Sequence, residues 1–112
     1  MAGTLLAQTQ QTASRRMEIQ VELRKGEQWT KVDPSTVLEK EAQIRFRVKA
    51  SFAGYLYVMN QGTGGTYALL FPREDTGQAN RLEPGREYTV PATDGAFRIA
   101  GPPGHDIVYW IV

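Results

Sequence analysis

The sequence predicts an all-β domain: an antiparallel β-sandwich of about seven strands, immunoglobulin-like in the broad sense. Short segments in which apolar and polar residues alternate with a period of two predict the strands. Eleven glycines and six prolines supply the turns between them. No long segment has helical periodicity, and 112 residues fit one domain. A small closed β-barrel is the alternative arrangement.

The N-terminal third of the domain contains two predicted strands and a connection. Residues 17–24 alternate between apolar and polar side chains, which is typical of a half-buried strand. Gly26 ends this strand, and Trp29 opens a second, shorter extended segment. Residues 36–41 follow a proline and form either one helical turn or a plain loop.

Residues 44–48 form the next predicted strand, again with apolar and polar side chains in alternation. If this strand lies beside the first one, Glu18 and Glu22 are expected opposite Arg45 and Arg47. Exposed pairs of this kind contribute to strand register more than to stability.

Residues 54–60 are predicted to form a strand that is apolar on both faces. Tyr55, Tyr57 and Met59 lie on one face, and Leu56 and Val58 on the other. Such a strand is either central in its sheet or meets a partner with one face. The glycine-rich residues 61–65 predict a hairpin loop. Residues 66–71 then form the return strand, which Pro72 ends because proline has no amide proton to donate.

The C-terminal part begins with a long polar connection, residues 72–85, of a length that is often functional or mobile. Residues 86–90 and 96–100 are two further short predicted strands. A rigid turn at 101–104 leads into the final apolar strand at 107–112.

These segments carry a resemblance to a known family. The residues concerned are Gly54-Tyr55-Leu56-Tyr57-Val58-Met59-Asn60, a glycine-rich turn, Leu69-Leu70-Phe71-Pro72, Asn80, Pro84-Gly85, Pro91, Phe97 and Gly101-Pro102-Pro103-Gly104. This order is similar to the signature of the bacterial family called Domain of Unknown Function 4384, over roughly residues 17–112. The resemblance implies a β-sandwich accessory module of exported bacterial proteins, or one fused to caspase-like peptidases, kinases or helical repeats. It supplies no established catalytic residues, and we expect no such catalytic partner in this chain.

Composition excludes several classes of function. The chain has no cysteine and a single histidine, which excludes disulfides and cysteine-based metal sites, and we expect no cofactor. Its net charge is +1, with basic residues interleaved among acidic ones, so we expect no nucleic-acid binding. Spanning a bilayer takes about 20 consecutive apolar residues. No apolar segment of this chain approaches that length, so we do not expect an integral membrane protein.

Residues 1–16 are interpreted separately from the domain at 17–112. The apolar run at 3–7 precedes a polar stretch rich in Gln and Thr. This pattern fits either a disordered leader on a cytoplasmic protein or the remnant of a signal peptide cleaved near Ala7. In the second case the domain is periplasmic or secreted.

One arrangement of nucleophile and base is conceivable: His105 and Asp106 with Ser14, Ser35 or Ser51. Adjacent strand residues point in opposite directions, so Asp106 is poorly placed to orient His105. We therefore expect a turn histidine and no enzyme.

Two further patterns are judged structural. The glycines of residues 61–65 precede a strand rather than the helix that a phosphate loop needs. The carboxylates that could gather around Ca²⁺ are scattered and mixed with arginines, which favours solvated loop charges. These carboxylates are Glu74, Asp75, Glu83 and Asp106.

The aromatic residues are the richest chemical resource. The rings concerned belong to Tyr55, Tyr57, Tyr67, Tyr88, Tyr109 and Trp110. Either most of them fill the core, or some of Tyr55, Tyr57 and Tyr67 face outward beside the hairpin and residues 73–80. An outward platform suits a protein or a sugar.

The sequence therefore predicts a non-catalytic binding module that contacts a protein partner through its aromatic strand and the long 72–85 connection, with strand addition as one mode of contact. A carbohydrate or cell-wall glycan is the alternative ligand, and a hydrolase ranks third. The candidate binding residues are Tyr55, Tyr57, Tyr67, Arg73, Glu74, Asp75, Asn80 and Arg81.

Overall fold

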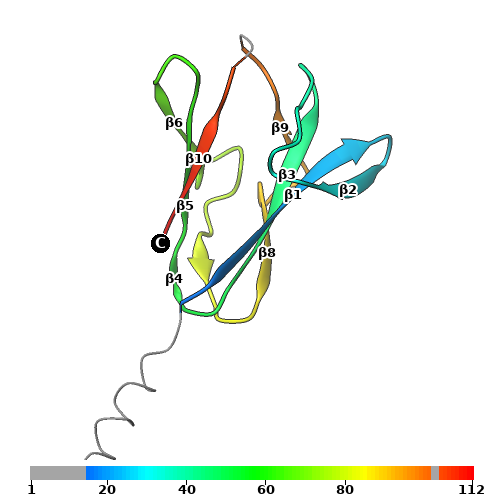
Figure 1. Cartoon of the computed structure of the whole chain (residues 1–112). Coiled ribbons are helices and arrows are strands. Elements are labelled where there is room, and N and C mark those ends of the chain that lie inside the picture. The colour runs from blue at the N-terminus through cyan, green and yellow to red at the C-terminus, as the bar shows by residue number, and fades with distance from the viewer. Residues whose placement is uncertain (1–14, 102–103) are drawn as a thin grey trace, which may run out of the picture.

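A computed structural model describes residues 15–101 and 104–112 and confirms the all-β prediction. These residues contain ten strands, of which seven are four residues or longer. Two antiparallel sheets face each other as the layers of a sandwich (Figure 1). The predicted leader, except its last two residues, and the centre of the predicted 101–104 turn lie outside the described residues.

The first sheet has the strand order β2-β1-β3-β8, and β9 also pairs with β3. Its strands are β1 (Met17–Lys25), β2 (Gln28–Val32), β3 (Gln43–Ala50), β8 (Glu87–Val90) and β9 (Phe97–Arg98). The connection at 36–41 is a loop with turns and contains no helix, which decides between the two predicted forms.

The register between β1 and β3 confirms one predicted ion pair and corrects the other. Glu22 lies opposite Arg45, and their Oε1 and Nε atoms are 2.6 Å apart. Glu18 lies opposite Lys49 rather than Arg47. Glu18 and Glu22 are further apart along β1 than Arg45 and Arg47 are along β3. No single antiparallel register can therefore place both expected pairs directly opposite each other. Arg47 instead forms an ion pair with Glu87 on β8.

The second sheet has the order β10-β5-β6, and the central position of β5 is one of the two alternatives that the sequence leaves open. Its strands are β5 (Tyr57–Gln61), β6 (Tyr67–Phe71) and β10 (Ile107–Ile111). Beside it lies a small ladder of β4 (Gly54–Tyr55) and β7 (Arg81–Leu82).

The predicted single strand at 54–60 is in fact two strands that separate at Leu56. The backbone N–H of Leu56 donates to the carbonyl of Asn80 at 2.8 Å, and the Asn80 side-chain amide donates to the Leu56 carbonyl at 3.0 Å. These two bonds replace ladder bonds at the point where the chain changes partner, from β7 to β6 and β10.

The long connection at 72–85 is more structured than a free polar loop. Leu82 of β7 is 2% exposed and belongs to the core, and Thr76 is buried as well. The Thr76 hydroxyl donates to the carbonyl of Leu70 at 2.7 Å, and the Thr76 carbonyl accepts a bond from the Ala92 N–H. The connection is therefore fastened to both sheets rather than hanging from their ends.

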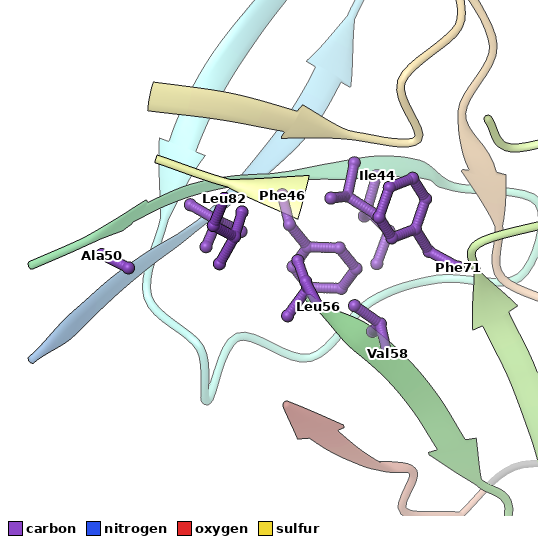
Figure 2. Close-up of a cluster of buried hydrophobic side chains, with 9 residues drawn as sticks. Ile44, Phe46, Ala50, Leu56, Val58, Phe71 and Leu82 are labelled. Carbon is purple, nitrogen blue, oxygen red and sulfur yellow. The ribbon is translucent and has the colours of Figure 1, made fainter. Parts of the chain in front are cut away.

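The core fills the space between the two sheets (Figure 2). Its buried side chains come from both layers: Ile44, Phe46, Val48, Ala50, Leu56, Val58, Phe71, Leu82 and Val90. Phe46 of β3 meets Trp110 of β10 edge to face, with ring centroids 5.0 Å apart. Aromatic pairs of this geometry contribute about 0.5–1.5 kcal/mol beyond the area they bury. None of the described residues forms a helix that is long and apolar enough to cross a membrane.

Candidate functional site

The two sheets differ in the chemistry of their outer faces. On the first sheet, the side chains that point away from the core are charged or polar except for the half-buried Trp29, which the Arg45 guanidinium covers at 4.4 Å from the ring centroid. The charged and polar ones include Glu18, Gln20, Glu22, Arg45, Arg47 and Lys49. This alternation of apolar inside and polar outside is usual for an antiparallel sheet with one wet face. The outer face of the first sheet is therefore suited to contact with water.

The second sheet is apolar on both faces. Its outer side chains form three rows across the strands: Ile111 with Tyr57, then Tyr109 with Met59 and Leu69, then Ile107 with Gln61 and Tyr67. We call these eight residues the outer aromatic face. Their neighbours along the strands, such as Val58 and Phe71, point inward and are buried. Both faces are apolar because apolar residues occupy the odd as well as the even positions of these strands, and successive side chains point to opposite faces.

Six members of the outer aromatic face are substantially exposed. Tyr67, Ile107 and Ile111 are 56%, 52% and 48% exposed. Tyr57, Leu69 and Tyr109 are 45%, 38% and 38% exposed. The face carries no ionised side chain, so a polar ligand would find few partners on it.

The polar atoms of the face bond to one another. The Tyr109 hydroxyl donates to Oε1 of Gln61 at 3.0 Å, and the rings of Tyr109 and Tyr67 lie 5.9 Å apart. Desolvation by its neighbours, and then the nearby Tyr67 hydroxyl, raise the pKa of Tyr109 above its ordinary value of 10.0. The Tyr109 phenol is therefore neutral at physiological pH.

The remaining predicted residues are not all gathered on this face. Tyr55 lies opposite Arg81 in the small β4–β7 ladder, and the guanidinium sits over the ring, 5.6 Å from its centroid. Arg81 also donates to Glu83 at 2.8 Å. The bond to Glu83, and then that to Tyr55, raise the pKa of Arg81. This exposed pair is separated from β5 by the break at Leu56.

Arg73 and Asp75 lie just beyond the end of β6, beside the outer aromatic face. Arg73 holds both carboxylate oxygens of Asp75 at 2.9 Å and donates a third bond to the carbonyl of Leu69 at 3.1 Å. Glu74 between them is exposed. Asn80, by contrast, uses its side chain to hold the Leu56 backbone.

Sequence reasoning missed part of the face. Met59, Leu69, Ile107 and Ile111 were not among the candidate residues, and Tyr109 was considered only as one of several rings. The alternation within residues 107–111 was the available signal. This signal identifies the face only if the strand is known to lie beside β5, and the sequence does not reveal which strands are neighbours.

The serines considered for catalysis have structural bonds. The Ser35 hydroxyl donates to Oδ1 of Asp33 at 2.6 Å, within a turn between β2 and β3. Ser51 Oγ accepts from the backbone N–H of Arg16 at 2.8 Å. The His105 carbonyl accepts a bond from the Thr63 hydroxyl in the β5–β6 hairpin loop. Ser14 lies outside the described residues.

The glycines at 61–65 close the β5–β6 hairpin, as predicted. Among the carboxylates considered for Ca²⁺, Asp75 pairs with Arg73 and Glu83 pairs with Arg81. The described residues contain no group of three or more His, Cys, Asp or Glu side chains that could hold a metal ion.

The fold and the face together define a β-sandwich module with one charged and one apolar outer surface. A family model described as Domain of unknown function (DUF4384) matches residues 37–112, and the chain belongs to this family. The match confirms the resemblance noted in the sequence and includes every strand of the second sheet. No curated protein and no solved structure matches the chain.

Proposed function

We propose that this protein is a non-catalytic binding module, and that a protein partner docks on the outer aromatic face. The observation that carries the proposal is the contrast between the two sheets: one outer face is charged, and the other exposes three tyrosines and three aliphatic side chains. Apolar groups left in water contribute nothing to the stability of the fold. A partner surface that covers them would gain binding free energy from their burial.

The size of the face supports this proposal. An aromatic side chain can bury 150–250 Å², so the exposed fractions of Tyr57, Tyr67 and Tyr109 leave about 200–350 Å² of tyrosine surface in water. Leu69, Ile107 and Ile111 add to this area. The largest apolar patch on a typical monomer is about 300–600 Å² and is often functional. Tyrosine is also enriched at protein interfaces.

The chemistry of the face favours a protein over a glycan. A sugar ring stacked on tyrosine also needs hydrogen-bond partners for its hydroxyls, and Gln61 is already engaged by Tyr109. Contact with Leu69, Ile107 and Ile111 would remove water from the sugar hydroxyls and supply no hydrogen bond in return. The Arg73–Asp75 pair beside β6 supplies the polar rim that protein interfaces commonly have.

Site-specific photocrosslinking in the native host tests the proposal. A photoreactive phenylalanine derivative replaces Tyr57 or Tyr67 on the outer aromatic face, and Gln20 or Lys49 on the charged face as matched controls. We expect positions 57 and 67 to crosslink a protein other than the chain itself, and the control positions not to do so. A Leu69→Lys substitution placed beside the probe should abolish the crosslink.

Equal crosslinking from both faces, or none from positions 57 and 67, would contradict the proposal. Binding to an insoluble polysaccharide that Leu69→Lys abolishes, without any protein crosslink, would replace it with the glycan alternative.

A further inference from the structure

The edges of the two sheets are not equally protected. A strand edge presents unpaired N–H and C=O groups, and proteins usually blunt such edges with charges, prolines or covering loops. On β2 the edge carries the charged Lys31. The edge of β6 ends at Pro72 and is covered by Arg73 and Thr76, whose side chains bond to the carbonyls of Leu69 and Leu70.

Among the described residues, the edge of β10 has none of these protections. Its five residues, Ile-Val-Tyr-Trp-Ile, contain no charge, no proline and no glycine. Within the described part of the chain, β5 is its single strand neighbour, and the backbone bonds outside the strands do not involve it. A strand of this kind is suited to pairing with another strand.

The residue pattern of β10 is complementary to itself. Along an edge strand, every second residue points its backbone N–H and C=O groups toward the neighbouring strand. In an antiparallel pair, such a residue must lie opposite a residue of the same kind. Two identical strands meet this condition only if the two-fold axis passes through a residue. An axis at Tyr109 is the one choice that pairs all five residues. It places Tyr109 opposite Tyr109 and Ile107 opposite Ile111.

We propose that two copies of this chain form a symmetric dimer by antiparallel pairing of their β10 strands, with the two-fold axis at Tyr109. The second sheets of the two copies then form one continuous sheet. Each copy contributes the same surface, as a closed two-fold interface requires.

The side chains agree with this register. On the outer face, Ile107 packs against Ile111 of the other copy, and the two Tyr109 residues lie opposite each other at the axis. On the inner face, Val108 packs against Trp110 of the other copy. Cross-strand pairs of aromatic and β-branched residues are among those that stabilise sheets. The net charge of +1 leaves little repulsion between copies.

The dimer does not depend on the proposed protein partner, because it uses an edge rather than a face. Pairing in the plane of the sheet leaves Tyr57, Tyr67 and Leu69 exposed. It joins the two outer aromatic faces into one larger surface.

Sedimentation velocity of the full chain across the micromolar range tests the proposal, with Tyr109→Lys as the test variant and Leu69→Lys as its control. Tyr109 and Leu69 are both 38% exposed and belong to the same row of the outer face, but Leu69 lies at the far edge of the sheet. We expect wild type and Leu69→Lys to sediment as dimers and Tyr109→Lys at half that mass.

A mixing experiment tests the axis itself, and variants that had lost their fold could not regain the dimer on mixing. Tyr109→Glu should also be monomeric, whereas an equimolar mixture of the Lys and Glu variants should regain the dimer mass, because position 109 faces itself. A monomeric wild type would overturn the proposal. So would dissociation by Leu69→Lys, persistence of the dimer in Tyr109→Lys, or a mixture that stays monomeric.

Discussion

Gly77 has a backbone φ of +104°, a conformation that residues with a side chain rarely adopt. A Cβ atom at this position would lie 2.8 Å from Cβ of Ala92 and 3.5 Å from the Phe71 ring. Its carbonyl also accepts the bond from the Arg73 N–H that closes the turn after β6. Glycine is therefore required here both for its conformation and for the close approach of two segments.

Replacing Gly77 with alanine should lower the free energy of unfolding by about 1–3 kcal/mol, from backbone strain and the clash with Ala92. Chemical denaturation measures the loss. Gly64→Ala is the control, since a Cβ there meets nothing and φ is not positive. Equal losses for both variants would contradict this reading of Gly77.

The turn between β2 and β3 has a pH-dependent bond. The Ser35 hydroxyl, and then the Ser35 backbone N–H, hold the pKa of Asp33 below its ordinary value of 3.8. A folded-state pKa below the unfolded one means that the carboxylate stabilises the fold above pH 3.8, and that this contribution is lost as the pH falls through the folded pKa. Ser35→Ala should raise the pKa of Asp33 toward 3.8. An NMR titration of the Asp33 carboxyl measures it, and an unchanged midpoint would refute the assignment.

At the scale of elements, the break between β4 and β5 depends on Asn80. Its side chain bonds to the Leu56 carbonyl, which no neighbouring strand satisfies at that position. Asn80→Ala should therefore lower the free energy of unfolding by about 1–2 kcal/mol, the cost of leaving a partly buried carbonyl without its partner. The exposed Gln78 of the same segment is the control, and Gln78→Ala should change stability by less than about 0.5 kcal/mol. Thermal and chemical denaturation distinguish the two.

Most strands were predictable because alternation within a strand is a local property. The segments at 17–24 and 44–48 show it clearly, and their strands formed almost as expected. The break at Leu56 was not predictable, since residues 54–60 read as one continuous apolar strand. Its cause is a hydrogen bond from Asn80, which lies 24 positions further along the chain.

Similar reasoning explains the errors in the long 72–85 connection. Arg81 and Leu82 form only a two-residue strand, too short for a periodic signal. Leu82 is the one leucine in a polar stretch, and this isolated apolar residue proved to be part of the core. The register of Glu18 was also beyond sequence reasoning, because it depends on where β1 and β3 meet.

At the scale of the whole molecule, the two sheets divide the tasks of solubility and recognition in our account. The charged outer face of the first sheet suits contact with water, and the outer aromatic face of the second suits contact with a partner. Outward positions for Tyr55, Tyr57 and Tyr67 were one of two alternatives that the sequence left open, and the structure places all three rings outward. The contribution of β10 to the face could not be predicted, because it depends on which strands are neighbours.

We propose that the outer aromatic face serves binding and is not needed for folding. The most direct test is the free energy of unfolding of a variant in which Tyr57, Leu69, Ile107 and Ile111 are all replaced by threonine, a residue that strands tolerate well. We expect each substitution to lower the free energy of unfolding by about 1 kcal/mol or less, the size of a cross-strand pair contribution, so that the variant folds but no longer crosslinks its partner. An unfolded variant, or a folded one that keeps the same crosslinks from position 67, would contradict it.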